Sequence, residues 1–270
     1  MSTGWFVAAT AAFGPGGCGV TPAPGRSEEG RVSDEALAGA LTMKGLRPLS
    51  RTARLAMVTA AHVWPTSSGS RTDASGRDAT VLGSRWASAT PLAEFVAVAA
   101  AEGPDRVFPM AFPNTVASVH AGYVATLLGL TGPVVSLCGA GAGLESALEA
   151  LSLLDAGRAD RVLVVAADAA EAPVALARPD AREASCALRL TREHEAGSPA
   201  RVTGWWVAAS EKQLPHRRTV EMPDVGDCGA AGGLLDLCAA VARVQRSGEP
   251  EVVVGACGVR GAAAVRLEPA

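Results

Sequence analysis

The stretch "LCGAGAGLESALEAL" (Leu137–Leu151) puts a run of Gly and Ala between an apolar segment and an amphipathic helix. Ninety residues later the chain repeats the pattern as "CGAAGGLLDLCAAV" (Cys228–Val241). The two copies align without a gap, as do the apolar runs that follow them, "RVLVVAADA" (161–169) and "EVVVGACGV" (251–259). This shared order of elements indicates a duplicated half-domain, in which small residues at both helix starts let two backbones approach closely.

Composition limits the classes of protein that the chain can belong to. It has 270 residues, 49% of them hydrophobic and 4% aromatic, enough to bury a large core of closely packed helices and strands. The formal net charge of -3 gives no basic surface, so we expect no nucleic acid partner. The sequence has neither a signal peptide nor a run long enough to cross a membrane, so we expect a cytoplasmic protein without a membrane partner.

The six cysteines show no CxxC pair and no histidine at ligand spacing. We therefore expect buried, reduced thiols and neither a metal nor a cofactor.

Hydrophobic patterning predicts strands alternating with helices. We expect an N-terminal half over residues 1–191 and a shortened C-terminal half over 201–270, packed as one domain. Loops are predicted at 14–35 and 65–79. The predicted strands cover 4–12, 80–86, 134–138, 161–169, 184–193, 201–210, 251–257 and 262–268, and the clearest helices cover 50–64, 91–102, 143–156 and 229–246.

The motifs, in this order, resemble those of the β-ketoacyl synthases. The landmarks are a GLxGP turn (129–133), the glycine-rich elbow, and Gly-x-Ala-Asp (157–160) before a buried strand. "GDCGAAGG" (226–233) is similar to the GHxxGAAG element of that family, and "CGVRGAAAVRLEP" (257–269) to its terminal pair of strands. The resemblance implies a thiolase-like α/β fold with αβαβα layers: two related halves, each with a mixed five-stranded sheet, around buried central helices.

The chain departs from this family where catalysis would occur. The family uses a cysteine at the start of the central helix, where the helix dipole and backbone N–H groups lower its pKa, and two histidines from the second half. Counting back from Asp160 places the nucleophile at Ala140, and counting forward from Pro133 places it at Gly141; neither has a sulfur atom. Asp227 replaces the histidine of GHxxGAAG. We therefore predict no catalytic residue.

More particularly, the chain resembles the chain length factor subunit of type II polyketide synthases. That resemblance implies a heterodimer with a catalytic β-ketoacyl synthase, and an acyl carrier protein with its phosphopantetheine-bound acyl chain as a further partner. The silent subunit would bound the acyl or polyene tunnel. Core packing is the alternative for Phe108, Met110 and Phe112, and a buried, hydrogen-bonded side chain is the alternative for His120. The residues predicted for tunnel and interface are Phe108, Met110, Phe112, Thr115, Val116, Val119 and His120.

Two other functions remain open from the sequence. The chain could be an acyl-thioester enzyme: an acyltransferase or hydrolase using Cys138, or a malonyl decarboxylase that needs no nucleophile. Because Cys138 stands two residues before the nucleophile position, a buried structural thiol is the simpler interpretation. The chain could also be a homodimeric scaffold that binds a carrier protein.

Overall fold

The structure is a computed structural model, and it describes most of the chain. The loop predicted at 14–35, and residues 65–75 of the loop predicted at 65–79, lie outside the described part. The described residues are 4–13, 49–64, 76–214, 227–257 and 261–270.

The first half forms a mixed five-stranded sheet in the order β3-β2-β4-β5-β1. Strand β2 pairs in parallel with β3 and β4, whereas β5 pairs antiparallel with β4 and β1. This confirms the five strands expected for this half. They are β1 (Trp5–Phe13), β2 (Asp78–Ser84), β3 (Val134–Cys138), β4 (Arg161–Asp168) and β5 (Ala184–Thr191).

The second half contributes three antiparallel strands in its described residues, not the five that we expected. They are β6 (Ala200–Ala208), β8 (Gly261–Glu268) and β7 (Glu251–Cys257), and β6 also pairs with β1, so all eight strands form one continuous sheet. The second half has fewer described strands than expected because its chain is short. Only about twenty residues separate β6 from the next helix, and one crossover between parallel strands already takes a dozen or more.

The duplication is visible in the topology. Helix α5 (Ala142–Asp155) precedes β4, and helix α7 (Ala230–Ser247) precedes β7. Three strands of the first half pair antiparallel in the order β4-β5-β1, and the three strands of the second half pair antiparallel in the equivalent order β7-β8-β6. The strand before α5 has no counterpart before α7 among the described residues, so the copies match as αββ units.

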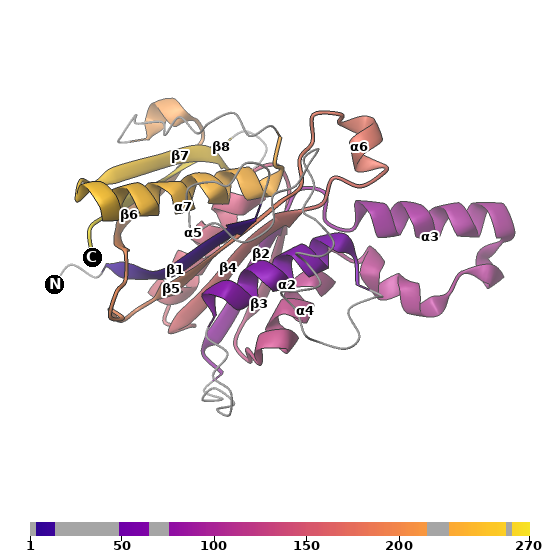
Figure 1. The fold of residues 1–270 in the computed structure, drawn as a ribbon, viewed down its shortest axis with the longest axis horizontal. Coiled ribbons are helices and arrows are strands. Elements are labelled where there is room, and N and C mark those ends of the chain that lie inside the picture. The colour runs from indigo at the N-terminus through magenta and orange to yellow at the C-terminus, as the bar shows by residue number, and fades with distance from the viewer. Residues whose placement is uncertain (1–3, 14–48, 65–75, 215–226, 258–260) are drawn as a thin grey trace.

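Helices α5 and α7 lie between the two halves of the sheet, while α2 (Arg51–Val63) and α4 (Val119–Leu128) cover the outer face of the first half (Figure 1). The alternation of side chains along β4 divides the core accordingly. Val162, Val164 and Ala166 pack toward α5 and α7, and the residues between them pack toward α2 and α4. Because β4 is covered on both faces, its sequence is continuously apolar.

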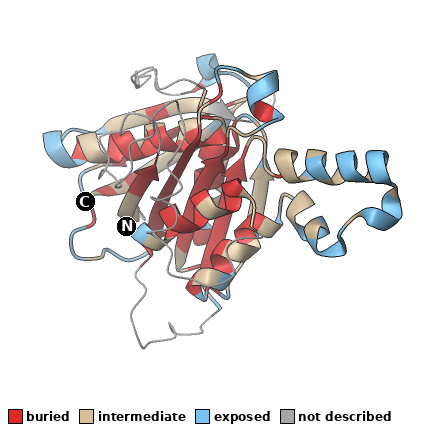
Figure 2. Cartoon of the chain, turned by 45° about the vertical axis from the view of Figure 1, so that its right-hand side comes forward, coloured by how far each residue is buried: buried red, intermediate tan, exposed pale blue. Residues whose placement is uncertain are grey.

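One helical unit projects from this layered body. It consists of α3 (Ala89–Glu102), the short 3-10 helix η1 (Pro104–Arg106) and the 3-10 helix η2 (Pro109–Thr115), which together we call the arm (Figure 1). No residue of these three helices is buried, and Figure 2 shows the arm in the colours of exposed and intermediate residues.

Two shorter elements complete the described chain: helix α6 (Val174–Ala177) and the 3-10 helix η3 (Glu211–Gln213). Within the described part, no helix has the length and hydropathy to span a bilayer.

Candidate functional site

The segment that leads from β3 into the N-terminus of the central helix α5 contains only small residues. Strand β3 ends at Cys138, Gly139 turns the chain with a φ of 142° that favours glycine, and Gly141 precedes the first helical residue, Ala142. The two predicted nucleophile positions, Ala140 and Gly141, thus lie at the helix N-terminus as expected. They present a methyl group and a hydrogen atom there, neither of which can attack a thioester.

The N-terminus of α7 contacts the N-terminus of α5. A Cβ atom added to Gly143 would overlap the carbonyl oxygen of Ala230 and lie 3.2 Å from the amide nitrogen of Leu234. The first turns of α5 and α7 therefore meet backbone to backbone. This confirms that small residues at the helix starts allow a close approach.

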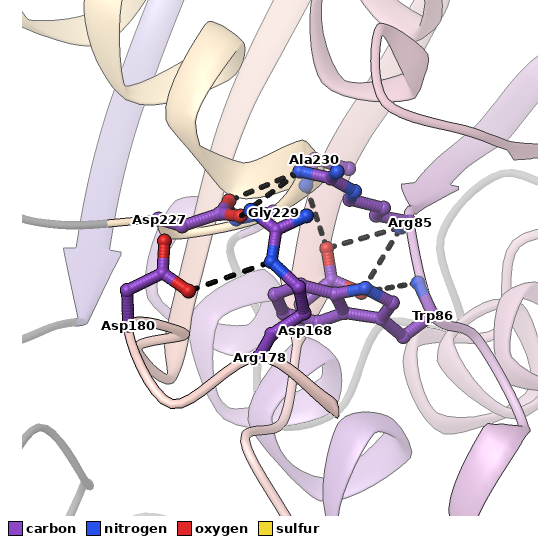
Figure 3. Close-up of polar contacts among 8 residues, drawn as sticks. All are labelled: Arg85, Trp86, Asp168, Arg178, Asp180, Asp227, Gly229 and Ala230. Carbon is purple, nitrogen blue, oxygen red and sulfur yellow. Dashed lines mark hydrogen bonds and ion pairs between the residues drawn. The ribbon is translucent and has the colours of Figure 1, made fainter. Parts of the chain in front are cut away.

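The side chain of Asp168, at the end of β4, forms hydrogen bonds with the end of β2 and with the start of α7. Its carboxylate accepts hydrogen bonds from the backbone N–H groups of Arg85 and Trp86 at 3.0 Å and from the N–H of Ala230 at 2.7 Å (Figure 3). It also accepts a hydrogen bond from Ser84 Oγ at 2.7 Å. The side chain is completely buried. Burial raises its pKa, and the four donors oppose that rise because they stabilise the charged form.

Asp227, the predicted counterpart of the family's histidine, is held by two arginines (Figure 3). Its carboxylate accepts from Arg85 Nη1 at 3.1 Å and from Arg178 Nη2 at 2.6 Å, and also from the N–H of Gly229 at 3.0 Å. A carboxylate that accepts hydrogen bonds from two guanidinium groups and a backbone N–H is fixed in orientation. This position therefore has a structural role.

Cys138 is exposed, so the expectation of a buried thiol is wrong for this residue. The reason is that β3 is an edge strand, whose outer side no other described strand covers. Partial desolvation and the negative charge of Asp168 raise the pKa of the Cys138 thiol, which lowers the thiolate fraction that a nucleophile needs. Cys186, Cys228 and Cys238 are buried and not joined in disulfides, as expected.

The residues predicted to line an interface divide into two groups. Phe108, Met110 and Phe112 are 67%, 71% and 55% exposed on the arm, so the core alternative is wrong for these three residues. Val116, beyond the arm, is also exposed. Thr115 and Val119 are partly exposed, and the Thr115 hydroxyl donates to the Phe112 carbonyl oxygen at 2.8 Å.

His120 lies elsewhere, buried beneath α2. Its Nε2 is 2.9 Å from the hydroxyl of Ser50, the residue that caps α2, and its Nδ1 has no hydrogen-bond partner. Burial lowers the pKa of His120 to about 4, so the ring is neutral at physiological pH. The buried-histidine alternative therefore describes this residue, and it is not part of the exposed surface.

A pocket of about 560 Å³ opens between the arm and the first turn of α2. Its lining includes Phe108, a residue predicted for the tunnel or interface, together with Arg54, Phe95 and Arg106, for which no functional role was predicted. Among the described residues, no cluster of His, Cys, Asp or Glu has the composition of a metal site.

Sequence reasoning missed the arginines of the site. Arg85 and Arg178 come from segments 142 and 49 residues away from Asp227, and no local pattern links the three. A conspicuous signal was available only for Asp168, which follows a buried apolar run where a turn or cap residue is expected.

Comparisons with known proteins agree with this geometry. Residues 27–198 match the family model of the β-ketoacyl synthase N-terminal domain. No curated protein sequence matches the chain.

Several solved structures share the fold. The ishigamide ketosynthase/chain length factor matches with a TM-score of 0.79 at 18% identity, over 98% of this chain and 99% of that one. The complex AntDE:AntF, a type II polyketide synthase acyl carrier protein with its ketosynthase bound to the hexaketide, matches with a TM-score of 0.78 at 12% identity, over 100% of both chains. The ketosynthase ApeO in complex with its chain length factor ApeC, from Xenorhabdus doucetiae, matches with a TM-score of 0.59 at 14% identity, over 98% of this chain and 99% of that one.

The family match covers well over half of the chain, and the strand order and paired central helices agree with the thiolase-like fold of these structures. The chain therefore belongs to the β-ketoacyl synthase family.

Proposed function

We propose that the chain is a non-catalytic, ketosynthase-like subunit, a chain length factor, that forms a heterodimer with an active β-ketoacyl synthase. In that heterodimer it bounds the tunnel for the acyl or polyene chain that an acyl carrier protein delivers on its phosphopantetheine arm. The setting is type II polyketide or polyene biosynthesis.

The site supports the non-catalytic half of this proposal. Ala140 and Gly141 have no group that can form a thioester, and Asp227 is occupied by Arg85 and Arg178. A nucleophile and a general base within reach of each other are the minimum for acyl transfer in this family. The chain therefore depends on a partner for the chemistry.

The exposed apolar surface of the arm is the observation that best supports the proposed heterodimer. Helix α3 is apolar, yet none of its residues is buried, and Leu92 and Val96 are exposed one turn apart on the face away from the pocket. Met110 and Phe112 of η2 are exposed as well, and the Phe112 ring lies edge-on against Phe95 of α3. Contiguous exposed apolar surface of this kind is typical of a protein–protein interface.

Strand β3 supports the same assignment. It lies at one end of the sheet, and its Val134 is exposed. An edge strand has a row of unpaired N–H and C=O groups that a second chain can complete.

Co-expression with the active β-ketoacyl synthase of the same gene cluster tests the pairing. We expect a one-to-one heterodimer by native mass spectrometry, and we expect Leu92→Asp and Val96→Asp each to weaken it at least tenfold, because a charge placed in an apolar interface is desolvated. Val207→Asp is the matched control, since Val207 is also exposed but lies on β6, away from the arm. A chain that stays monomeric or homodimeric beside the synthase would overturn the proposal.

The tunnel function has its own readout. In the heterodimer, Phe112→Ala removes bulk from the arm and should lengthen the product, whereas Cys138→Ala should leave the rate of product formation unchanged. Loss of condensation with Cys138→Ala would instead support the acyl-thioester enzyme.

A further inference from the structure

Two buried thiols face each other between the two halves of the chain. Cys186 lies on β5, Cys238 lies in the middle of α7, and their Sγ atoms are 3.1 Å apart. Both residues are completely buried, and neither thiol belongs to a disulfide. The Cys238 sulfur has a second contact, with the carbonyl oxygen of Ala187 at 3.9 Å. The two thiols therefore connect the sheet of the first half with the central helix of the second half.

The two sulfur atoms are close to bonding distance. A disulfide bond is about 2.05 Å long, so a movement of about 1 Å would bring these atoms together. The neighbours of Cys186 in the adjacent strands are Ala12 of β1 and Ala166 of β4, which belong to the same core cluster and have only methyl side chains. The closing movement therefore displaces no large side chain of these two strands.

The surroundings of this pair keep it unreactive while the protein is closed. Both cysteines belong to the apolar core cluster that lies between the sheet and the central helices. A thiol in apolar surroundings reacts slowly, because the thiolate is the reactive form and apolar burial disfavours it. Oxidation of the pair therefore requires α7 to move transiently away from β5, so that a small oxidant can reach the thiols.

We infer that Cys186 and Cys238 are a redox-sensitive pair, which hydrogen peroxide converts into a disulfide between the two halves. One cysteine, as the thiolate, attacks a peroxide oxygen and becomes a sulfenic acid, and the first water molecule leaves. The other thiol attacks the sulfenic sulfur, the S–S bond forms, and the second water molecule leaves. The two cysteines together lose two electrons and two protons, which reduce the peroxide to water. This pair does not depend on the proposed pairing with a synthase, because both thiols belong to this chain.

Treatment of the Cys138→Ala chain with hydrogen peroxide tests the pair, since this variant lacks the exposed thiol. We expect the intact mass to fall by about 2 Da, for the two hydrogen atoms lost, and a peptide map to show a disulfide between Cys186 and Cys238. Dilute urea should accelerate the reaction, because it makes the opening of α7 more frequent. Because the disulfide closes a long loop, oxidation should raise Tm by roughly 5–15 °C, and dithiothreitol should reverse the rise.

Cys228→Ala, added to the same chain, is the matched control, because Cys228 is also a buried thiol but precedes the first residue of α7. The rise in Tm should persist in Cys228→Ala and be lost in Cys238→Ala. Cys186→Ala should behave like Cys238→Ala and provides the same test if that variant does not fold. The inference is overturned if both thiols survive peroxide in dilute urea, if either becomes a sulfinic acid instead, if Cys238→Ala retains the rise, or if the disulfide does not raise Tm.

Discussion

Replacing Gly143 by alanine tests the backbone contact between the central helices. An added Cβ would overlap the carbonyl oxygen of Ala230, a backbone atom that cannot rotate away, so α5 and α7 would have to separate. Inserting a methyl group into a well-packed core typically costs about 1–3 kcal/mol, and we expect the upper end or more here, because both helices are packed between the two halves of the sheet. In a chain of this size, a loss of about 3 kcal/mol lowers Tm by roughly 6–12 °C.

Gly233→Ala is the matched control on the facing helix. A Cβ there would lie 3.4 Å or more from Leu144, which is ordinary van der Waals contact, and alanine favours a helix over glycine by about 1 kcal/mol. We therefore expect Gly233→Ala to be neutral or stabilising. Chemical denaturation monitored by circular dichroism gives both free energies of unfolding. A Gly143→Ala protein within about 0.5 kcal/mol of the wild type, or equal losses for both variants, would refute the backbone contact.

Three further predictions concern buried polar groups. Glu183→Gln should cost about 3–5 kcal/mol of unfolding free energy because it removes the negative charge that the buried Arg51 guanidinium binds, whereas the double variant Arg51→Met/Glu183→Leu should cost much less. A double-mutant cycle by denaturation measures this difference, and additive losses would contradict it. Asp168→Asn should cost about 3 kcal/mol, seen as a lower denaturation midpoint, because an amide N–H then faces backbone donors that the carboxylate had satisfied. The pKa of His120, lowered to about 4, is below the value of about 6.5 in the unfolded chain, so unfolding takes up a proton between these values and stability falls as the pH decreases from 6.5 toward 4. The full difference corresponds to about 3 kcal/mol, and His120→Gln should flatten the pH dependence of stability in this window; an unchanged profile would contradict it.

The secondary structure was largely predictable from local patterns. Strand β4 was recognisable because it is covered on both faces and hence continuously apolar, and α2 because Ser50 caps a helical stripe. The duplication was predictable for a similar reason, since α5 and α7 occupy equivalent places and both need small residues at their first turns.

Features that depend on distant parts of the chain were not predictable. Helix α3 has the Ala- and Val-rich composition of a core helix, and only the tertiary structure shows that it packs mainly against η1 and η2 and buries none of its residues in the described part of the chain. Cys138 sits in an apolar run but lies exposed because β3 is the last strand of the sheet. The absence of a sulfur nucleophile was visible in the sequence, whereas the partners of Asp227 required the fold to bring Arg85 and Arg178 together.

The pairing of Asp227 with two arginines limits which residues position 227 can accept. Asp227→His would remove the carboxylate that Arg85 and Arg178 bind and would place a third basic group beside them. Under the proposed function, the stability of the fold by itself then favours aspartate at this position over the histidine of an active synthase.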